Sequence, residues 1–212
     1  MSLELYLHPL ASYCWKVLIA FYENGTPFEP RIVDDASRPG FEHILSLGKF
    51  PVLRDGARDR TIPESSIIIE YLAQHYPGPI KLLPDSPELA LETRLADRFY
   101  DLYVHESMQK IVADKIRPAG KSDPYGVEQA RARLATAYEM IDRNMEAKTW
   151  SVGDTFTMAD CAAAPALYYA DLVAPFRKTF TNAAAYLRRL EQRPSFARVI
   201  QEAQPYFALF PG

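Results

Sequence analysis

The chain is poor in cysteine, in long apolar runs and in surplus charge, and each shortage excludes a class of protein. Only two cysteines, Cys14 and Cys161, occur in 212 residues, so no disulfide framework is implied and we expect a reducing, cytoplasmic location. No segment approaches about 18 uninterrupted apolar residues, so we expect no membrane-spanning helix. The first residues lack a basic segment followed by a long apolar run, so a signal peptide is not predicted.

The charge balance argues against an anionic partner. The formal net charge is −3, and basic residues are interleaved with acidic ones, so we expect neither nucleic acid nor an anionic membrane as a partner. The four histidines show no metal-ligand spacing with one another or with cysteine. We therefore expect no metal site.

The first third of the chain alternates strand and helix patterns. Residues 3–8 alternate apolar and polar side chains as a half-buried strand does, and residues 13–22 carry apolar side chains at helical spacing. The strand expected at 28–33 contains Pro30, which cannot donate to a ladder, so this strand is predicted at a sheet edge. The remaining elements expected here are an irregular helix after residue 40, strands at 51–55 and 60–62, and a helix at 64–76. This order is typical of a thioredoxin-like α/β domain, predicted over residues 1–78.

The rest of the chain reads as helical. Three prolines punctuate residues 79–87, which we interpret as a linker pinned to the surface. No convincing strand follows. Helical spacing predicts an all-α domain over residues 88–212, with helices at 88–116, 125–147, 158–172, 182–192 and 195–204.

Two short motifs in the first domain carry candidate binding chemistry. Lys49-Phe50-Pro51 opens an apolar strand, and Glu64-Ser65 opens an apolar helix. The N-terminus of a helix exposes unpaired N–H groups, and Ser65 adds a hydroxyl, so a carboxylate finds donors there, while Glu64 can pair with an ammonium group. Each motif also has a plain structural interpretation, a strand start for the first and a helix cap for the second.

In combination, and together with the strand and helix of residues 3–22, these motifs resemble the glutathione site of the cytosolic glutathione transferases. The resemblance implies a cis Phe50-Pro51 bond, with the main chain of Phe50 holding the cysteinyl unit of glutathione. It implies Lys49 for the glycyl carboxylate, and Glu64 with Ser65 for the γ-glutamyl end. The implied function is detoxification by conjugation of glutathione, the co-substrate, to small apolar electrophiles. The implied assembly is a homodimer.

A transferase must present glutathione as its thiolate, and the residues from Ala11 to Val17 are the place for the activating group. A free thiol has a pKa near 8.5, and lowering it by about two units needs about 2.7 kcal/mol of preference for the anion. The stretch resembles that of serine-type, zeta-like transferases at Ser12, Trp15 and Val17, but Ala11 stands where their usual serine lies. Ser12 is our first choice of activator.

Three other side chains stay open as activators: Tyr6, Tyr13 and Cys14. In glutaredoxin-like and omega-like sites the reactive cysteine occupies the position of Ala11, and Cys14 matches only the resolving position. Three other functions also stay open. They are a glutathione-dependent isomerase, a thiol oxidoreductase acting through Cys14, and a non-catalytic binding protein, an alternative that Ala11 keeps open.

The helical half adds an acceptor pocket and a folding motif. By the resemblance, the pocket lies between the domains and is lined by the first long helix and the C-terminal tail, and its candidate residues are Tyr103, Ser107, Met108, Phe207 and Phe210. A helix-bundle core with a docked tail is the alternative interpretation. Thr157 and Asp160 stand three residues apart before an apolar helix, which predicts a capping box with a structural role.

Overall fold

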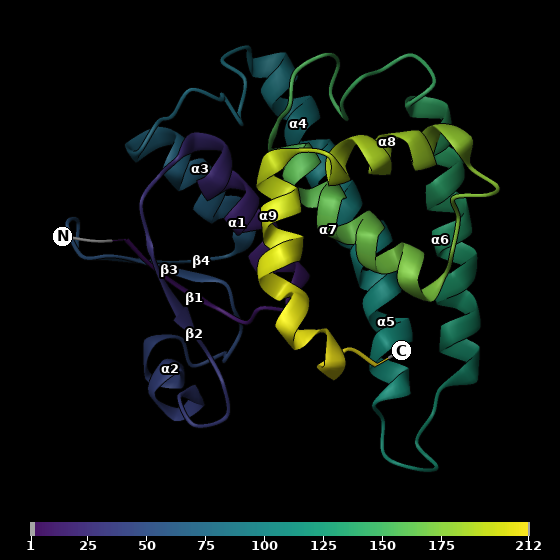
Figure 1. Ribbon diagram of the computed structural model, residues 1–212, viewed down its shortest axis with the longest axis horizontal. Coiled ribbons are helices and arrows are strands. Elements are labelled where there is room, and N and C mark those ends of the chain that lie inside the picture. The colour runs from purple at the N-terminus through teal and green to yellow at the C-terminus, as the bar shows by residue number, and fades with distance from the viewer. Residues whose placement is uncertain (1–2, 212) are drawn as a thin grey trace.

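The N-terminal half is built on a four-stranded mixed sheet, seen in a computed structural model that describes residues 3–211 (Figure 1). Strand β1 (Leu3–Leu7) runs parallel to β2 (Glu29–Ile32) and antiparallel to β3 (Val52–Asp55), which pairs antiparallel with β4 (Arg60–Pro63). The strand order is β2-β1-β3-β4. The proline-bearing strand β2 therefore lies at an edge, as predicted, because the sheet needs no N–H from Pro30 on the open side.

Three helices accompany this sheet: α1 (Ser12–Asn24), α2 (Arg38–Ile44) and α3 (Ser65–His75). The alternation of β1 buries Leu3, Leu5 and Leu7, which join the main core with α1 and α3. On the other face, Val52 joins a smaller cluster with Val33 and Phe41, against which Tyr6 packs. Helix α1 ends at Gly25, whose φ of +59° suits glycine in a left-handed C-cap.

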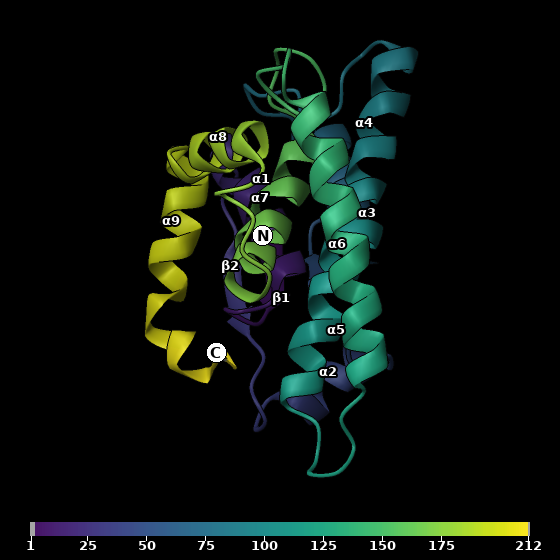
Figure 2. The same cartoon turned by 90° about the vertical axis from the view of Figure 1, so that its right-hand side faces the viewer.

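The C-terminal half is helical, so the predicted order of a thioredoxin-like domain and an all-α domain is confirmed. In place of one helix at 88–116, the chain forms α4 (Pro87–Phe99), a π-helical segment η1 (Tyr100–His105) and α5 (Glu106–Lys115) without interruption. The remaining elements are α6 (Pro124–Asn144), α7 (Met158–Val173), α8 (Thr181–Glu191), α9 (Pro194–Ala203) and a 3₁₀ segment η2 (Gln204–Leu209). Figure 2 shows α5 and α6 side by side.

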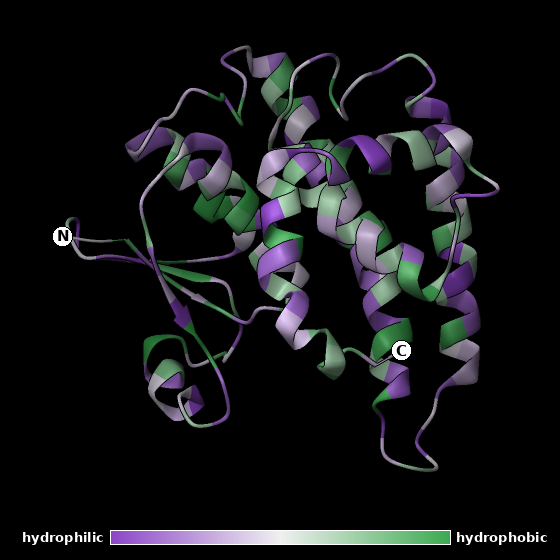
Figure 3. Ribbon diagram, viewed as in Figure 1, coloured by the Kyte–Doolittle hydropathy of each residue, from purple (hydrophilic) through white to green (hydrophobic). Residues whose placement is uncertain are grey.

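Helices α1 and α7 pack together and make the two halves share one core. Trp15 of α1 is fully buried, donates its indole N–H to the carbonyl oxygen of Pro9 at 2.6 Å, and packs its ring 4.8 Å from that of Tyr169 on α7. Coloured by hydropathy, α1 is largely apolar, whereas α6 mixes apolar and hydrophilic residues because only one of its faces meets the core (Figure 3). Between residues 3 and 211, the structure contains no helix that is both long and apolar enough to cross a bilayer.

A buried ionic cluster also joins the halves. Lys16 of α1 is 1% exposed, and its Nζ lies 2.5 Å from Asp97 Oδ1 and 2.8 Å from Asp101 Oδ2. It also donates to the Ser66 hydroxyl of α3 at 2.8 Å, and that hydroxyl donates to Asp97 Oδ2 at 2.7 Å. The cluster thereby fixes the first turns of α1 and α3 against α4 and η1.

Candidate functional site

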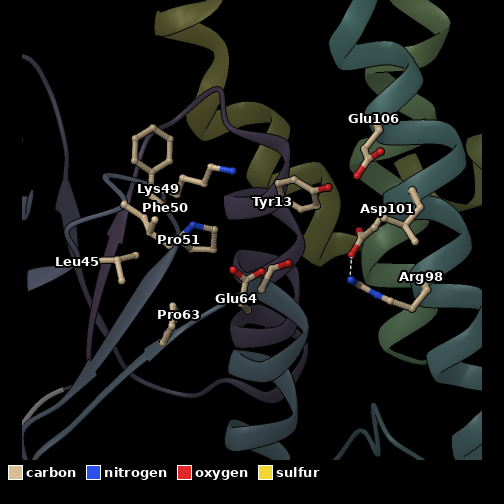
Figure 4. A pocket seen from close by; sticks show the side chains of 13 residues that line it. Tyr13, Leu45, Lys49, Phe50, Pro51, Pro63, Glu64, Arg98, Asp101 and Glu106 are labelled. Carbon is tan, nitrogen blue, oxygen red and sulfur yellow. Dashed lines mark hydrogen bonds and ion pairs between the residues drawn. The ribbon is translucent and has the colours of Figure 1, made fainter. Parts of the chain in front are cut away.

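Two adjoining cavities open between the two halves. The smaller has a volume of about 230 Å³ and is lined by residues of the sheet domain and of α4, η1 and α5, among them Lys49, Phe50, Pro51, Glu64, Ser65, Arg98, Asp101 and Glu106. Figure 4 looks into it, with Lys49, Phe50 and Pro51 on one side and Arg98, Asp101 and Glu106 on the other. The larger, about 690 Å³, shares Tyr13, Lys49 and Phe50 with the smaller.

The start of α3 forms one wall of the smaller cavity. Glu64 is the N-cap residue, with φ +70° and ψ 117°, a backbone conformation that residues other than glycine rarely adopt. Among residues 3–211 no side chain caps the helix, so the N–H groups of its first turn have no side-chain partner there. Ser65 is the first residue of the helix and 6% exposed. Strained backbone and uncapped donors beside a cavity are features typical of a ligand site.

The opposite wall places a positive charge beside that helix start. Arg98 pairs with Asp101 and donates to the Ser66 hydroxyl at 2.9 Å. Burial raises the pKa of Asp101, although Lys16 and Arg98 act against it. Glu106 lines the same cavity, and the structure gives it no ion-pair partner among the residues it describes. The cavity therefore offers a guanidinium, a hydroxyl and carboxylates, a set suited to a zwitterionic amino-acid group.

The bond between Phe50 and Pro51 is cis, and Phe50 lines both cavities. Its ring packs 5.8 Å from that of His8, at the end of β1. Lys49, which is exposed, and Arg38 from the start of α2 line the larger cavity, and neither has an ion-pair partner among residues 3–211. None of the described residues that line this cavity is acidic, so these two cations give it a positive rim.

Ser12 begins α1 and lines the larger cavity. It is 7% exposed, and the preceding residue, Ala11, is an N-cap without a side chain that could bond the helix. The N-terminus of α1 therefore reaches the cavity with its partial positive charge uncapped and with one hydroxyl at its tip. This arrangement favours an anion placed near Ser12.

The other three candidate activators have less suitable surroundings. Burial, followed by the charges of Asp101 and Glu106, raises the pKa of Tyr13, so its phenol stays protonated although it lines both cavities. Tyr6 lines neither cavity, packs 5.8 Å from Phe41 and has a pKa raised chiefly by burial. Cys14 is fully buried, and burial raises the pKa of its thiol to about 12. It is inaccessible and un-ionised, which disfavours thiol exchange.

The expected acceptor residues separate into two groups. Met108 and Phe210 line the larger cavity together with Val112, Ile116 and Tyr169, which make an apolar wall. Tyr103 is 51% exposed, Ser107 is 1% exposed, and neither lines either cavity. Phe207 packs behind the wall, with its ring 6.2 Å from that of Trp15.

The residues missed by sequence reasoning are mainly polar side chains on the α4–η1–α5 segment: Arg98, Asp101, His105 and Glu106, together with His8, Arg38 and Tyr169 elsewhere. Arg98, Asp101 and His105 are separated by three and four residues, which is the spacing of one helical face. Charged and polar residues occur throughout residues 88–116, so this spacing alone does not single these three out in the sequence.

Thr157 and Asp160 form a capping box at the start of α7, away from both cavities. The Asp160 carboxylate accepts the Thr157 N–H at 2.8 Å, the Ser151 N–H at 2.8 Å and the Tyr186 hydroxyl at 2.6 Å. Asp160 is completely buried, so these donors substitute for water around its oxygens. Within residues 3–211, no group of His, Cys, Asp or Glu side chains is arranged to hold a metal ion.

Two family models match the chain. The model of the glutathione S-transferase N-terminal domain matches residues 5–80, and that of the glutathione S-transferase C-terminal domain matches residues 124–189. Among curated proteins, a glutathione S-transferase-like protein, LUC7, of Fusarium is 31% identical over 186 residues, spanning 84% of this chain and 83% of that protein. A stringent starvation protein A homolog of Coxiella burnetii is 31% identical over 169 residues, spanning 78% of this chain and 75% of that protein.

A solved structure agrees with both halves at once. A glutathione S-transferase of Methylobacterium radiotolerans, in complex with glutathione sulfonate, aligns with a TM-score of 0.82 and 29% identity. The alignment covers 94% of this chain and 95% of that one.

Proposed function

Because the chain belongs to the glutathione S-transferase family, we propose that it binds glutathione in the two cavities and transfers its sulfur to small apolar electrophiles. The observation that carries this proposal is spatial. The uncapped start of α3, the Phe50-Pro51 edge and the Ser12 end of α1 all line two adjoining cavities that share Tyr13, Lys49 and Phe50.

The charges of the cleft match the three ends of glutathione. Glu64, Ser65 and the first N–H groups of α3 would hold the γ-glutamyl ammonium and carboxylate in the smaller cavity, beside Arg98. The main chain of Phe50 would pair with the cysteinyl unit in the manner of an added strand. Lys49, at the rim of both cavities, would hold the glycyl carboxylate. The relative complexed with glutathione sulfonate supports the same ligand here.

Ser12 would then activate the thiol. A pKa decrease of two units requires about 2.7 kcal/mol of preference for the thiolate. A helix N-terminus supplies about 0.3–2 kcal/mol, and a hydrogen bond to a charged group about 1.5–3 kcal/mol. Together the end of α1 and the Ser12 hydroxyl suffice, without help from the protonated Tyr13 or the buried Cys14.

The apolar wall of the larger cavity suits a flat, apolar acceptor. This wall lines the same cavity as Ser12 and consists of Met108, Val112, Ile116, Tyr169 and Phe210. Burial of apolar ligand surface against this wall would provide affinity, while the thiolate provides the chemistry.

We also propose that the chain forms a homodimer in the cytoplasm. Leu91, Leu95 and Leu102 are 68%, 70% and 38% exposed and follow one another along α4 and η1 at helical spacing. Ile67 of the neighbouring helix α3 is 53% exposed. A row of exposed leucines favours burial against a second copy. The two free, buried cysteines suit a reducing compartment.

Substitution of the activator tests the proposal. We expect Ser12→Ala to lower the rate of glutathione conjugation to 1-chloro-2,4-dinitrobenzene at least about tenfold, with little change in glutathione affinity, because one charged hydrogen bond is lost. Cys14→Ser is the matched control, and its rate should stay near that of the wild type if the protein folds normally. An unchanged rate in Ser12→Ala would reject Ser12. A thiol–disulfide exchange activity that Cys14→Ser abolishes and Ser12→Ala leaves intact would indicate an oxidoreductase instead.

A second candidate function is a non-catalytic glutathione-binding protein. Ala11 stands where the resemblance places the usual serine, and a relative at 31% identity bears a name other than transferase. This alternative predicts glutathione binding with no lowering of the thiol pKa.

A further inference from the structure

Arg38 is a cation for which the proposed binding of glutathione has no use. It begins α2, is half-buried and lines the larger cavity. Glu42 follows one turn later, yet Arg38 has no ion-pair partner among residues 3–211. A guanidinium stays protonated in a protein, so its full charge remains at the cavity wall. A charge without a counter-ion at this place suits an anionic group on a ligand.

The two carboxylates of glutathione are already matched elsewhere. The γ-glutamyl carboxylate is proposed to lie at the start of α3 in the smaller cavity, and the glycyl carboxylate at Lys49, which lines both cavities. Arg38 lines only the larger cavity, together with the apolar wall that includes Met108 and Phe210. None of the described residues that line this cavity is acidic. A positive charge therefore remains unmatched on the acceptor side.

His8 adds a neutral donor on the same side. The backbone N–H of Leu10 donates to its Nδ1 at 3.2 Å, so the proton of the neutral ring lies on Nε2. Burial, and next the charge of Arg38, lower the pKa of His8, which keeps the ring neutral at physiological pH. His8 is half-buried, lines the larger cavity but not the smaller, and holds its ring 5.8 Å from that of Phe50. The larger cavity thus offers one ligand group a cation and an N–H donor.

We propose that the electrophile of this protein is apolar except for one carboxylate, which Arg38 binds as an ion pair with the Nε2–H of His8 as a second donor. This inference rests on the proposed function and narrows its substrate class. A carboxylate bound at Arg38 leaves the apolar surface of the acceptor for the wall of the larger cavity. Because the carboxylate is bound before and during the reaction alike, it contributes affinity and orientation and takes no part in the chemistry.

A matched pair of electrophiles tests this substrate class. The first is 4-chloro-3,5-dinitrobenzoate, which carries a carboxylate, and the second is the neutral 4-chloro-3,5-dinitrobenzamide of nearly equal shape. In both, the glutathione sulfur attacks the carbon that bears chlorine, a C–S bond forms, and chloride leaves with the electron pair of the C–Cl bond. The selectivity is the ratio of kcat/KM for the benzoate to that for the benzamide, each relative to its uncatalysed rate with glutathione. For the wild type this selectivity should be at least about ten, the effect of one charged hydrogen bond.

Substitutions of the two donors should lower this selectivity. Arg38→Gln removes the charge and should lower it at least about tenfold, chiefly through a higher KM for the benzoate, whereas Arg38→Lys keeps the charge and should lose only about threefold. His8→Phe keeps a ring beside Phe50, removes the donor and should lower the selectivity about threefold. The matched control is Arg60→Gln on β4, because Arg60 is exposed and lines neither cavity. Its selectivity should stay within about twofold of that of the wild type.

Three results would overturn the inference while the proposed function stands. The first is a wild type that conjugates both electrophiles without preferring the benzoate. The second is an equal loss of selectivity in Arg38→Gln and Arg60→Gln, which would show only an effect of net charge. The third is unchanged selectivity in Arg38→Gln with glutathione binding weakened about tenfold in calorimetry, which would assign Arg38 to the glycyl carboxylate.

A different result bears on the proposed function. A wild type that conjugates neither electrophile, although it binds glutathione, would reject the transferase itself and this inference with it. Conjugation of both electrophiles, with a selectivity that falls in Arg38→Gln and not in Arg60→Gln, would support the transferase and its acidic acceptor together.

Discussion

The buried lysine that joins the two halves gives the sharpest prediction about stability. Lys16 is 1% exposed, and the side chains of its two carboxylate partners, Asp97 and Asp101, are 2% and 4% exposed. Lys16→Met keeps the length of the side chain and removes its charge, leaving both carboxylates to the half-exposed Arg98. Breaking a buried ion pair by removing one partner costs about 3–5 kcal/mol, because the remaining charge stays desolvated. We expect a loss of unfolding free energy in that range.

Denaturation by urea, followed by the fluorescence of the buried Trp15 and of Trp150, measures this loss. The matched control is Arg143→Met, which breaks an exposed pair with Glu139 whose side chains are 78% and 55% exposed, and which should change the free energy by less than about 1 kcal/mol. A change below about 1 kcal/mol for Lys16→Met as well would refute the view that this cluster is a desolvated, closed set of charges. Replacing Lys16, Asp97 and Asp101 together by apolar residues should recover much of the lost stability, since the one charge left without these partners, on Arg98, is half-exposed to water.

Three further predictions follow from single residues. Asp160→Ala should lower the free energy of unfolding, measured by urea denaturation, by at least about 2 kcal/mol. This exceeds the roughly 0.5–2 kcal/mol of a helix cap alone, because the substitution also leaves buried donors unpaired. A smaller loss would show that water replaces the carboxylate. The pKa of His105 is about 4 in the folded protein and 6.5 in the unfolded chain, so its contribution to the free energy of unfolding is complete above pH 6.5 and decreases by about 3 kcal/mol as the pH falls to 4. The difference in unfolding free energy between the wild type and His105→Leu should therefore shrink or reverse over that interval. A difference that does not change with pH would contradict this prediction. Leu95→Glu should halve the mass found by light scattering, whereas Tyr125→Glu, on a residue equally exposed at 70%, should not; a dimer that survives Leu95→Glu would place the interface elsewhere.

Local patterns were enough to predict two features of the sheet. The alternation of residues 3–8 predicted the strand β1 with one buried face, and the proline in residues 28–33 predicted β2 at the edge, because both signals act within a few residues. The family resemblance supplied the cis bond before Pro51, which backbone preference alone does not select.

The segment from α4 to α5 shows where such patterns stop. The helical spacing of residues 88–116 predicted one continuous helix and gave no sign of the π-helical turn η1. Tyr103 is exposed and Ser107 is buried without lining either cavity, while Met108 reaches the larger one. Tertiary packing decides where a π turn forms, and no local sequence preference predicts its position.

The burial of Lys16 was equally invisible in the sequence. A single lysine in an apolar helix usually extends its charge to solvent, and the partners that keep it inside lie about 80 residues further along the chain. A similar separation in sequence hides the fact that Ser12 and His105 line the same cavity. These juxtapositions depend on how the two halves dock, which requires the folded structure.

The absorbance of glutathione thiolate, titrated against pH with the wild-type protein, tests the central claim most directly. If the start of α1 and Ser12 stabilise the anion, thiolate absorbance will appear about two pH units below the pKa of free glutathione, and Ser12→Ala will move it back toward the free value. Binding of glutathione with a thiol that ionises at its free pKa would contradict the account and leave the chain as a binding protein with a transferase fold.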